Sequence, residues 1–221
     1  HFTATSPQFS DVVNDNGLAS GTKYAVTEGG EIKIVAENIS LAKDSLIKAQ
    51  CYAGAVDGNI SLVANAQNAS ISLDGAMLIG KDINLNTTAS YTDNAFLGIA
   101  LNSSSATIDV KDSKFTASGD VKMNAVVAID VKAKTPSFMA DLIGDSAFAG
   151  AAVDSTARVK LDGTTDVTAT GAVSLVAQNT VDLIASAKAA ENIGETGKTN
   201  GGNNTGGGTL GFGIIHSTTE A

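Results

Sequence analysis

The chain has 221 residues, of which 43% are apolar and only 5% aromatic. This length allows one large domain or two small ones, and the core must be built from Val, Ile, Leu and Ala in thin layers. A formal charge of −9 and the single arginine, Arg158, argue against nucleic acid as a partner, because phosphate contacts need clustered basic residues. No apolar run approaches the roughly 20 residues that span a bilayer.

Residues 1–28 show no clear period and are rich in Ser, Thr, Asn and Asp, so we expect an irregular or capping N-terminal segment. A domain of repeated strands is expected over 29–221. Its first strand is indicated at Glu31–Ala36, where polar and apolar residues alternate, and the alternation returns in Gly58–Ala64. A helix would need apolar residues spaced three and four apart, which these segments lack.

The segment Arg158–Ala187 repeats a pattern that occurs 52 residues earlier. The apolar positions agree, and four other residues recur at this spacing: Gly119 as Gly171, Ala125 as Ala177, Asp130 as Asp182 and Ala133 as Ala185. Self-similarity at a fixed spacing is the signature of a repeat protein.

A second repeated motif consists of a glycine, a small or aliphatic pair, and a run of Ser and Thr. It occurs three times, in Ala95–Val110, Ala147–Leu161 and Leu210–Ala221. The alignment matches Gly98 with Gly150 and Gly213. The third copy follows at a longer spacing because of the insert Gly194–Gly208, which has too little side chain to bury and is expected to be a flexible surface loop.

Short alternating strands at a fixed long spacing predict an all-β fold, a parallel β-helix that is right-handed (a β-solenoid). Each 52-residue unit is expected to hold two or more coils, giving roughly ten coils of about 20 residues in a rod about 45–50 Å long. A β-sandwich is the rival, but it needs antiparallel hairpins with Asn-Gly or Asp-Gly turns, which are few here. The solenoid predicts inward ladders at Val121, Met123, Val173 and Leu175, with Lys122, Asn124 and Ser174 facing water.

Two of these patterns together resemble the repeat arrays of giant bacterial surface proteins. One is the strand pattern Gly-x-Val-x-Leu/Met-x-Ala of Gly119–Ala125 and Gly171–Ala177, and the other is the glycine and Ser/Thr motif. The chain is similar in these respects to filamentous-haemagglutinin-like and autotransporter-like adhesins over most of residues 29–221. The resemblance implies a secreted, cell-surface rod of right-handed β-helix, and it offers no family active site to carry over.

We therefore expect a non-catalytic structural or adhesive segment of a large secreted or cell-surface bacterial protein. His1 in place of Met, and an end in mid-pattern at Glu220-Ala221, suggest a fragment that is associated with the outer membrane through regions outside it. Expected partners are glycans or proteins of a host or neighbouring cell. End-to-end self-association is also expected, because uncapped coil ends present unpaired strand edges.

The alternative is a carbohydrate-binding or polysaccharide-degrading β-helix of the lyase or hydrolase kind. Such a lyase needs a basic proton abstractor beside acidic calcium ligands. Arg158 is the one arginine available, and Asp154, Asp162 and Asp166 lie near it in the sequence. A solvated turn with an ion pair worth about 0–1 kcal/mol explains the same residues.

No residue is assigned to a catalytic, cofactor or metal site. Asp130 and Asp182 occupy equivalent outward positions and are expected to be solvated residues that stack in a column. Asp109, Asp112 and Asp120 could be calcium ligands, but no calcium-loop motif surrounds them.

The two histidines and the single cysteine are also read as structural. His216 aligns with Leu101 and Val153, an inward position by pattern, and His1 lies far from it in sequence. Cys51 is expected to be a buried thiol, because no activating partner is apparent in the sequence.

Overall fold

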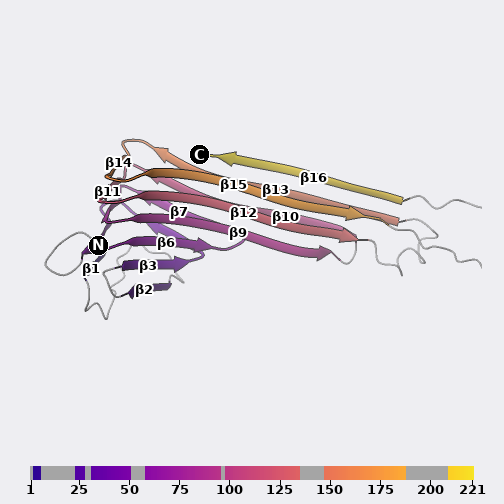
Figure 1. Cartoon of the computed structure of the whole chain (residues 1–221). Coiled ribbons are helices and arrows are strands. Elements are labelled where there is room, and N and C mark those ends of the chain that lie inside the picture. The colour runs from indigo at the N-terminus through magenta and orange to yellow at the C-terminus, as the bar shows by residue number, and fades with distance from the viewer. Residues whose placement is uncertain are drawn as a thin grey trace, which may run out of the picture.

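The computed structural model describes residues 2–5, 23–27, 31–50, 58–95, 98–134, 147–187 and 209–221. Within these ranges every regular element is a β-strand and none is a helix. The strands form three sheets, which we name A, B and C, and the long strands of B and C extend away from sheet A (Figure 1). The predicted all-β class is confirmed.

Sheet A consists of short strands: β1 (Phe2–Thr5), β5 (Leu46–Gln50), β8 (Met77–Gly80), β11 (Lys114–Ala117) and β14 (Asp166–Ala169). Sheet B consists of β2 (Lys23–Thr27), β3 (Glu31–Ala36), β6 (Ile60–Asn65), β9 (Ile83–Ala95), β12 (Val121–Lys134) and β15 (Val173–Ser186). Sheet C consists of β4 (Asn38–Leu41), β7 (Asn68–Asp74), β10 (Ile99–Lys111), β13 (Ala147–Asp162) and β16 (Thr209–Glu220).

From β3 onward the chain visits the sheets in a fixed order, B then C then A, and we call one such round a passage. Strands of successive passages are parallel, and in the described ranges the only antiparallel pair is β2 with β3. The parallel pairing of successive passages contradicts the antiparallel hairpins that a β-sandwich requires. Two strands, β1 and β2, lie within 1–28, and β2 covers the edge of β3.

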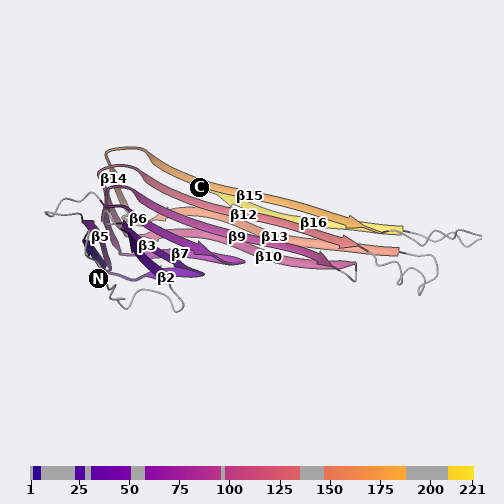
Figure 2. The ribbon, with the colours of Figure 1, turned by 60° about the horizontal axis from the view of Figure 1, so that its bottom comes forward.

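The 52-residue spacing is one passage and not two or more. β12 pairs with β15 over its whole length, beginning with Val121 opposite Val173. Earlier passages are shorter, because Val121 pairs with Ile83, 38 residues back, and Ile83 pairs with Ile60, 23 residues back. The strands of sheet B lengthen from six residues in β3 to 14 in β12, so the stack widens (Figure 2). The prediction of roughly ten coils of about 20 residues is therefore wrong, since the added length lies in longer strands.

In sheet C the register corrects the predicted alignment of the second motif by one residue. Ile99, not Gly98, lies opposite Gly150, and Gly150 lies beside Phe212 instead of Gly213. A Cβ at Gly150 would approach the Cζ atom of Phe212 to 2.7 Å. This glycine is therefore needed because a phenylalanine ring of the next passage packs on its backbone.

Inward-facing aliphatic side chains form ladders through the stack, as predicted. Val121 and Met123 are fully buried, whereas Val173 and Leu175 continue the same ladders and are only partly covered. The difference arises because no described strand of sheet B lies beyond β15. The predicted outward residues Lys122, Asn124 and Ser174 alternate with these ladders.

A residue with positive φ marks the corner between sheets C and A in each passage. These residues are Asp44 (65°), Gly75 (69°), Asp112 (48°) and Gly163 (63°). Glycine adopts this conformation without a steric penalty, and Asp tolerates it better than most residues. At Asp112 the side chain adds a contact, since its Oδ1 accepts hydrogen bonds from the backbone N–H (2.8 Å) and the Oγ1 hydroxyl (3.0 Å) of Thr164.

The corner between sheets A and B is joined by side-chain acceptors that link neighbouring passages. The Oδ1 atom of Asn59 accepts the N–H of Asp82 (3.3 Å), and the Oδ1 of Asp82 accepts the N–H of Asp120 (2.9 Å). The Oδ1 of Asp120 then accepts the N–H of Ala172 (2.9 Å). In each contact the acceptor belongs to the earlier passage.

Sheets B and C also enclose polar side chains, which the sequence patterns did not predict. Asn179 lies inward and donates from Nδ2 to the hydroxyl of Ser155 (3.0 Å), which links the two sheets. Ser104 donates to the Oδ1 of Asn102 (2.9 Å) beside this pair. Thr87 is fully buried, and its hydroxyl has no partner among the described residues.

Candidate functional site

The outer face of sheet C has two sections of different chemistry. The charged section lies near sheet A and contains Asp74, Asp109, Lys111, Arg158, Lys160 and Asp162. The apolar section lies toward the other end of the strands and contains Ile99, Leu101, Phe148, Leu210, Phe212 and Ile214. Both sections are built by alternation, because parallel strands in register place every second residue of β10 and β13 on the same face.

Arg158 forms an ion pair across two passages. Its Nη2 donates to the Oδ2 of Asp109 at 2.7 Å, and both side chains are about one-third exposed. The hydrogen bond to Asp109 raises the pKa of the Arg158 guanidinium, so the group stays protonated and cannot abstract a proton. Arg158 lies within the strand β13, and not in the turn that the sequence suggested.

The three aspartates near Arg158 in sequence have other partners. Asp154 contacts Nδ1 of His216 (3.1 Å), Asp162 accepts from Lys160 (3.0 Å), and Asp166 lies 3.9 Å from the Nζ of Lys114. None of them joins Arg158 in a cluster of the kind a lyase would need.

A hollow of about 220 Å³ lies within the charged section. Its walls are Ser72, Leu73, Asp74, Asp109, Val110, Lys111, Lys160 and Asp162, drawn from three neighbouring passages. Carboxylates and ammonium groups alternate around it, so hydrogen-bond acceptors and donors converge on one space. This arrangement suits a neutral polyhydroxylated ligand such as a sugar better than a single ion.

The apolar section is a continuous patch across three strands. Phe148 and Phe212 are in aromatic contact, with ring centroids 5.3 Å apart and planes tilted by 59°. Leu101 and Ile214 lie on either side of the smaller Ala152, because the register places all three in one row. Exposed apolar patches of this kind mark interaction surfaces more often than isolated exposed residues do.

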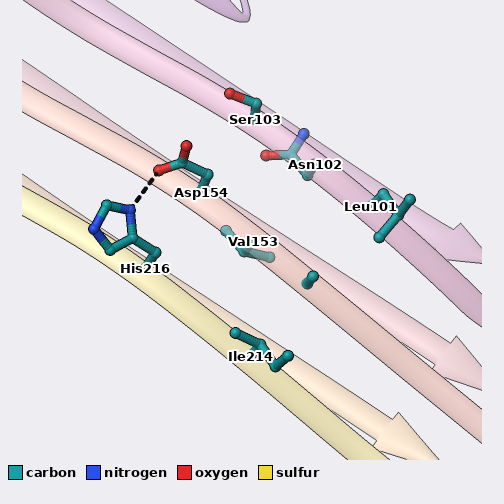
Figure 3. A pocket seen from close by; sticks show the side chains of 8 residues that line it. Leu101, Asn102, Ser103, Val153, Asp154, Ile214 and His216 are labelled. Carbon is teal, nitrogen blue, oxygen red and sulfur yellow. Dashed lines mark hydrogen bonds and ion pairs between the residues drawn. The ribbon is translucent and has the colours of Figure 1, made fainter.

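A second hollow, of about 410 Å³, lies where the apolar section meets polar side chains. Leu101, Val153 and Ile214 line its apolar part, and Figure 3 shows the dashed contact between His216 and Asp154 at its polar end. Ser103 completes the polar end from β10. The hollow is open to solvent.

His216 faces outward, and the predicted inward position is wrong. The register pairs it with Asp154 and not with Val153, so the sequence alignment was displaced by one residue. Its ring is largely exposed. His1 and Cys51 lie outside the described residues, as does the insert 194–208.

Asp130 and Asp182 lie directly opposite each other on the outer face of sheet B, and the predicted stacking is confirmed. Asp130 accepts from the Nζ of Lys132 at 2.7 Å. The pKa of Lys132 is raised chiefly by this hydrogen bond, and the nearby Asp182 adds to the effect. Lys132 thus offsets part of the negative charge of this column.

The suggested calcium ligands lie apart from one another in the structure. Asp109 pairs with Arg158, Asp112 holds Thr164 at one corner, and Asp120 holds Ala172 at another. Hydrogen bonds lower the pKa of the last two carboxyls, from Thr164 for Asp112 and first from Lys122 for Asp120. Across the described ranges no three His, Cys, Asp or Glu residues are grouped to hold a metal ion.

Among the residues that the structure describes, no helix is long and apolar enough to cross a membrane. Comparisons with models of protein families, with curated proteins and with solved structures find no match to this chain.

Proposed function

We propose that the chain is a non-catalytic structural and adhesive segment of a large secreted or cell-surface bacterial protein. In this proposal the three sheets are the faces of one right-handed parallel β-solenoid. The observation that carries it is the in-register stacking of β12 on β15, in which 14 consecutive residues of one repeat lie opposite their equivalents in the next. A body that lengthens by repeating one passage suits a spacer whose outer faces contact partners.

The apolar section of sheet C is the surface proposed for attachment. It presents six large apolar side chains next to the Asp154–His216 pair, so a partner could bury apolar area and still satisfy a polar rim. Its proposed partners are glycans or proteins on host or neighbouring cells.

Attachment can be measured with the purified chain coupled to beads, using bacterial and animal cells and a glycan array. The double variant Leu101→Ser with Ile214→Ser should reduce bead attachment at least tenfold, because it removes the centre of the patch. Val176→Ser is the matched control, since Val176 is an exposed apolar residue on the outer face of sheet B. Equal loss in both variants, or no attachment by the unaltered chain, would contradict the adhesive role.

The charged hollow supports the alternative, a carbohydrate-binding or polysaccharide-degrading solenoid. Its test is a screen of acidic and neutral polysaccharides with and without calcium, scored for binding and for new reducing or unsaturated ends. Binding without turnover would favour a glycan-binding module. Turnover that Arg158→Ala abolishes would overthrow the non-catalytic proposal.

A further inference from the structure

The outer face of sheet C carries opposite charges at paired positions of two neighbouring strands, β10 and β13. Both strands have a hydrogen-bonded neighbour on each side. The register places Asp109 of β10 beside Lys160 of β13. Two residues further on, it places Lys111 of β10 beside Asp162 of β13, so the order of charges on one strand is the reverse of that on the other. The four side chains are 37–59% exposed, and their charges therefore reach solvent.

This order of charges is complementary to itself under one two-fold rotation. Consider an axis parallel to the strands, above the gap between β10 and β13. Rotation about it keeps every residue at its position along the strands and places β10 of each copy over β13 of the other. Asp109 then faces Lys160 of the second copy. Lys111 likewise faces Asp162 of the second copy, and each of these contacts occurs twice.

Other positions of the axis bring unfavourable groups together. An axis directly above β10 would place Asp109 and Lys111 each over its own equivalent, and an axis above β13 would do the same for Lys160 and Asp162. An axis perpendicular to the strands would place the charged section over the apolar section. Like charges in a contact cost several kcal/mol, and packed sheets usually keep their strand directions within about 30° of each other. The register thus selects the axis between β10 and β13.

The same axis also brings the two apolar sections together. Leu101 is 74% exposed, and the register places the smaller Ala152 beside it and Ile214 beyond. Under the rotation, Leu101 of the second copy lies over Ala152. The hollow of about 410 Å³ is at this point of the face, so the leucine has a space to enter (Figure 3). Each copy contributes one such leucine and one such hollow.

We propose that the outer face of sheet C binds the same face of a second copy of this chain, with β10 of each copy packed over β13 of the other. The contact is isologous and therefore closes at a dimer. The inference rests on the proposed function for its biological use. It deepens that function, because it names the partner in attachment as a second copy of this chain on a neighbouring cell.

The overlapping area is sufficient for a reversible contact. The 13 residues of β10 extend about 40 Å, and the neighbouring strands make the face roughly 15–20 Å wide. Each copy would bury on the order of 600–800 Å², close to the share of one partner in a standard protein interface. The apolar section supplies most of the stabilisation, because exposed ion pairs contribute only about 0–1 kcal/mol each. The charged section sets the alignment of the two copies.

The test is charge reversal followed by mixing. The chain has a mass of 22.2 kDa, and sedimentation from about 1 µM to about 1 mM should show a species of twice this mass at the high concentrations. Lys111→Glu faces Asp162 of the second copy, and Asp162→Lys faces Lys111. Each variant alone should associate at least tenfold more weakly. Their equimolar mixture should recover most of the association, because the two substituted residues face each other in one contact and the two original residues in the other.

Lys114→Glu is the matched control, because it reverses a similar charge on another sheet. Lys114 is 54% exposed and lies 3.9 Å from Asp166 in sheet A, whereas Lys111 is 59% exposed and lies 3.9 Å from Asp112. Association of the control should remain within about twofold of the unaltered chain. A monomer at every concentration, no recovery in the mixture, or equal weakening by Lys114→Glu would overturn the inference.

A second variant and a bead assay separate this inference from the proposed function. Leu101→Glu should weaken association at least tenfold without a change in circular dichroism, because the side chain is already exposed. Beads coated with the unaltered chain should clump with one another, and beads coated with Leu101→Glu should stay separate. Attachment to cells by a chain that remains monomeric would overturn the inference and leave the proposed function intact. Dimers whose beads neither clump nor attach to cells would contradict the proposed function and leave the contact between copies standing.

Discussion

At the scale of single residues, aspartates at the corners explain how passages of different length are held in one stack. Asp82, Asp112 and Asp120 each accept a backbone N–H from the following passage. Asp112 does so from a positive φ, where glycine occupies the equivalent corner of two other passages. A side-chain contact thus accompanies the conformational cost of a non-glycine residue at this corner.

Asp112 should therefore make stability depend on pH. Hydrogen bonds from Thr164 lower its pKa in the folded chain, so its contribution is present above its unfolded pKa and is lost as pH falls through the lower folded value. Asp112→Asn keeps an Oδ1 acceptor and removes the charge. Thermal melts between pH 7 and pH 2.5 should show a smaller loss of midpoint below about pH 4 for this variant than for the unaltered chain.

Asp112→Ala removes both the charge and the hydrogen-bond acceptor, so its comparison with Asp112→Asn separates the two effects. It should lower the melting midpoint at pH 7, because Thr164 loses an acceptor and alanine is strained at positive φ. Lys111→Ala serves as the control, since its contact with Asp112 is long and exposed. Equal midpoints for Asp112→Ala and the unaltered chain at pH 7 would contradict this role.

Thr87 is the opposite case, because removal of its buried hydroxyl should stabilise the fold. Its side chain is fully buried, and its hydroxyl has no hydrogen-bond partner among the described residues. The neighbouring passages have Ala64 and Ala125 at this position of the ladder. Thr87→Val keeps the shape and should raise the free energy of unfolding by about 1 kcal/mol. Urea unfolding measures this, with the exposed Thr88→Val as the control; destabilisation by Thr87→Val would show that the hydroxyl has a partner in solution.

At the scale of elements, the short strands of sheet A close one end of the interior between the long sheets. Phe115 of β11 is the largest side chain fully enclosed there, between Leu78 and Val167 of the adjacent strands. Phe115→Ala should lower the free energy of unfolding by about 3–5 kcal/mol, because a ring-sized cavity forms in a layer with few aromatics. The exposed Lys114→Ala should change it by less than about 0.5 kcal/mol. A similar small effect for both would mean that sheet A is not packed as described.

The elements also show what the amino-acid pattern could predict. Period-2 alternation located β3, β6, β12 and β15, and the repeat placed Asp130 beside Asp182, because facing and spacing are local properties of the chain. The number of residues in a passage was missed, since alternation does not show where a long strand ends. The one-residue displacement around Gly150 was missed because the ring that packs on Gly150 belongs to Phe212, which lies in the next passage and is remote in sequence. Each of the two sections of sheet C combines residues from three neighbouring passages, so no local sequence motif predicts them.

At the scale of the whole molecule, stability should vary along the stack. β12 has neighbours on both sides and a fully buried inner face, whereas β16 has one neighbour among the described strands and has exposed side chains. Hydrogen exchange followed by mass spectrometry should therefore find the slowest amides in β9, β10 and β12, and exchange at least tenfold faster in β16. Uniform protection from β9 to β16 at low concentration would show that the stack opens as one unit.

The direction of the corner hydrogen bonds has a consequence for the order of assembly. At both corners the carboxylate belongs to the earlier passage and the N–H to the later one, as Asp120 with Ala172 and Asp112 with Thr164 show. A passage that has already folded thus presents fixed carboxylate acceptors to the next passage, which has not yet folded. At these carboxylate contacts, growth from the N-terminal end meets an acceptor that is already in place, whereas other corner hydrogen bonds run the opposite way, as from the N–H of Ala76 to the Oγ of Ser113. These carboxylate contacts therefore favour folding that proceeds from the N-terminal passage toward the C-terminal one.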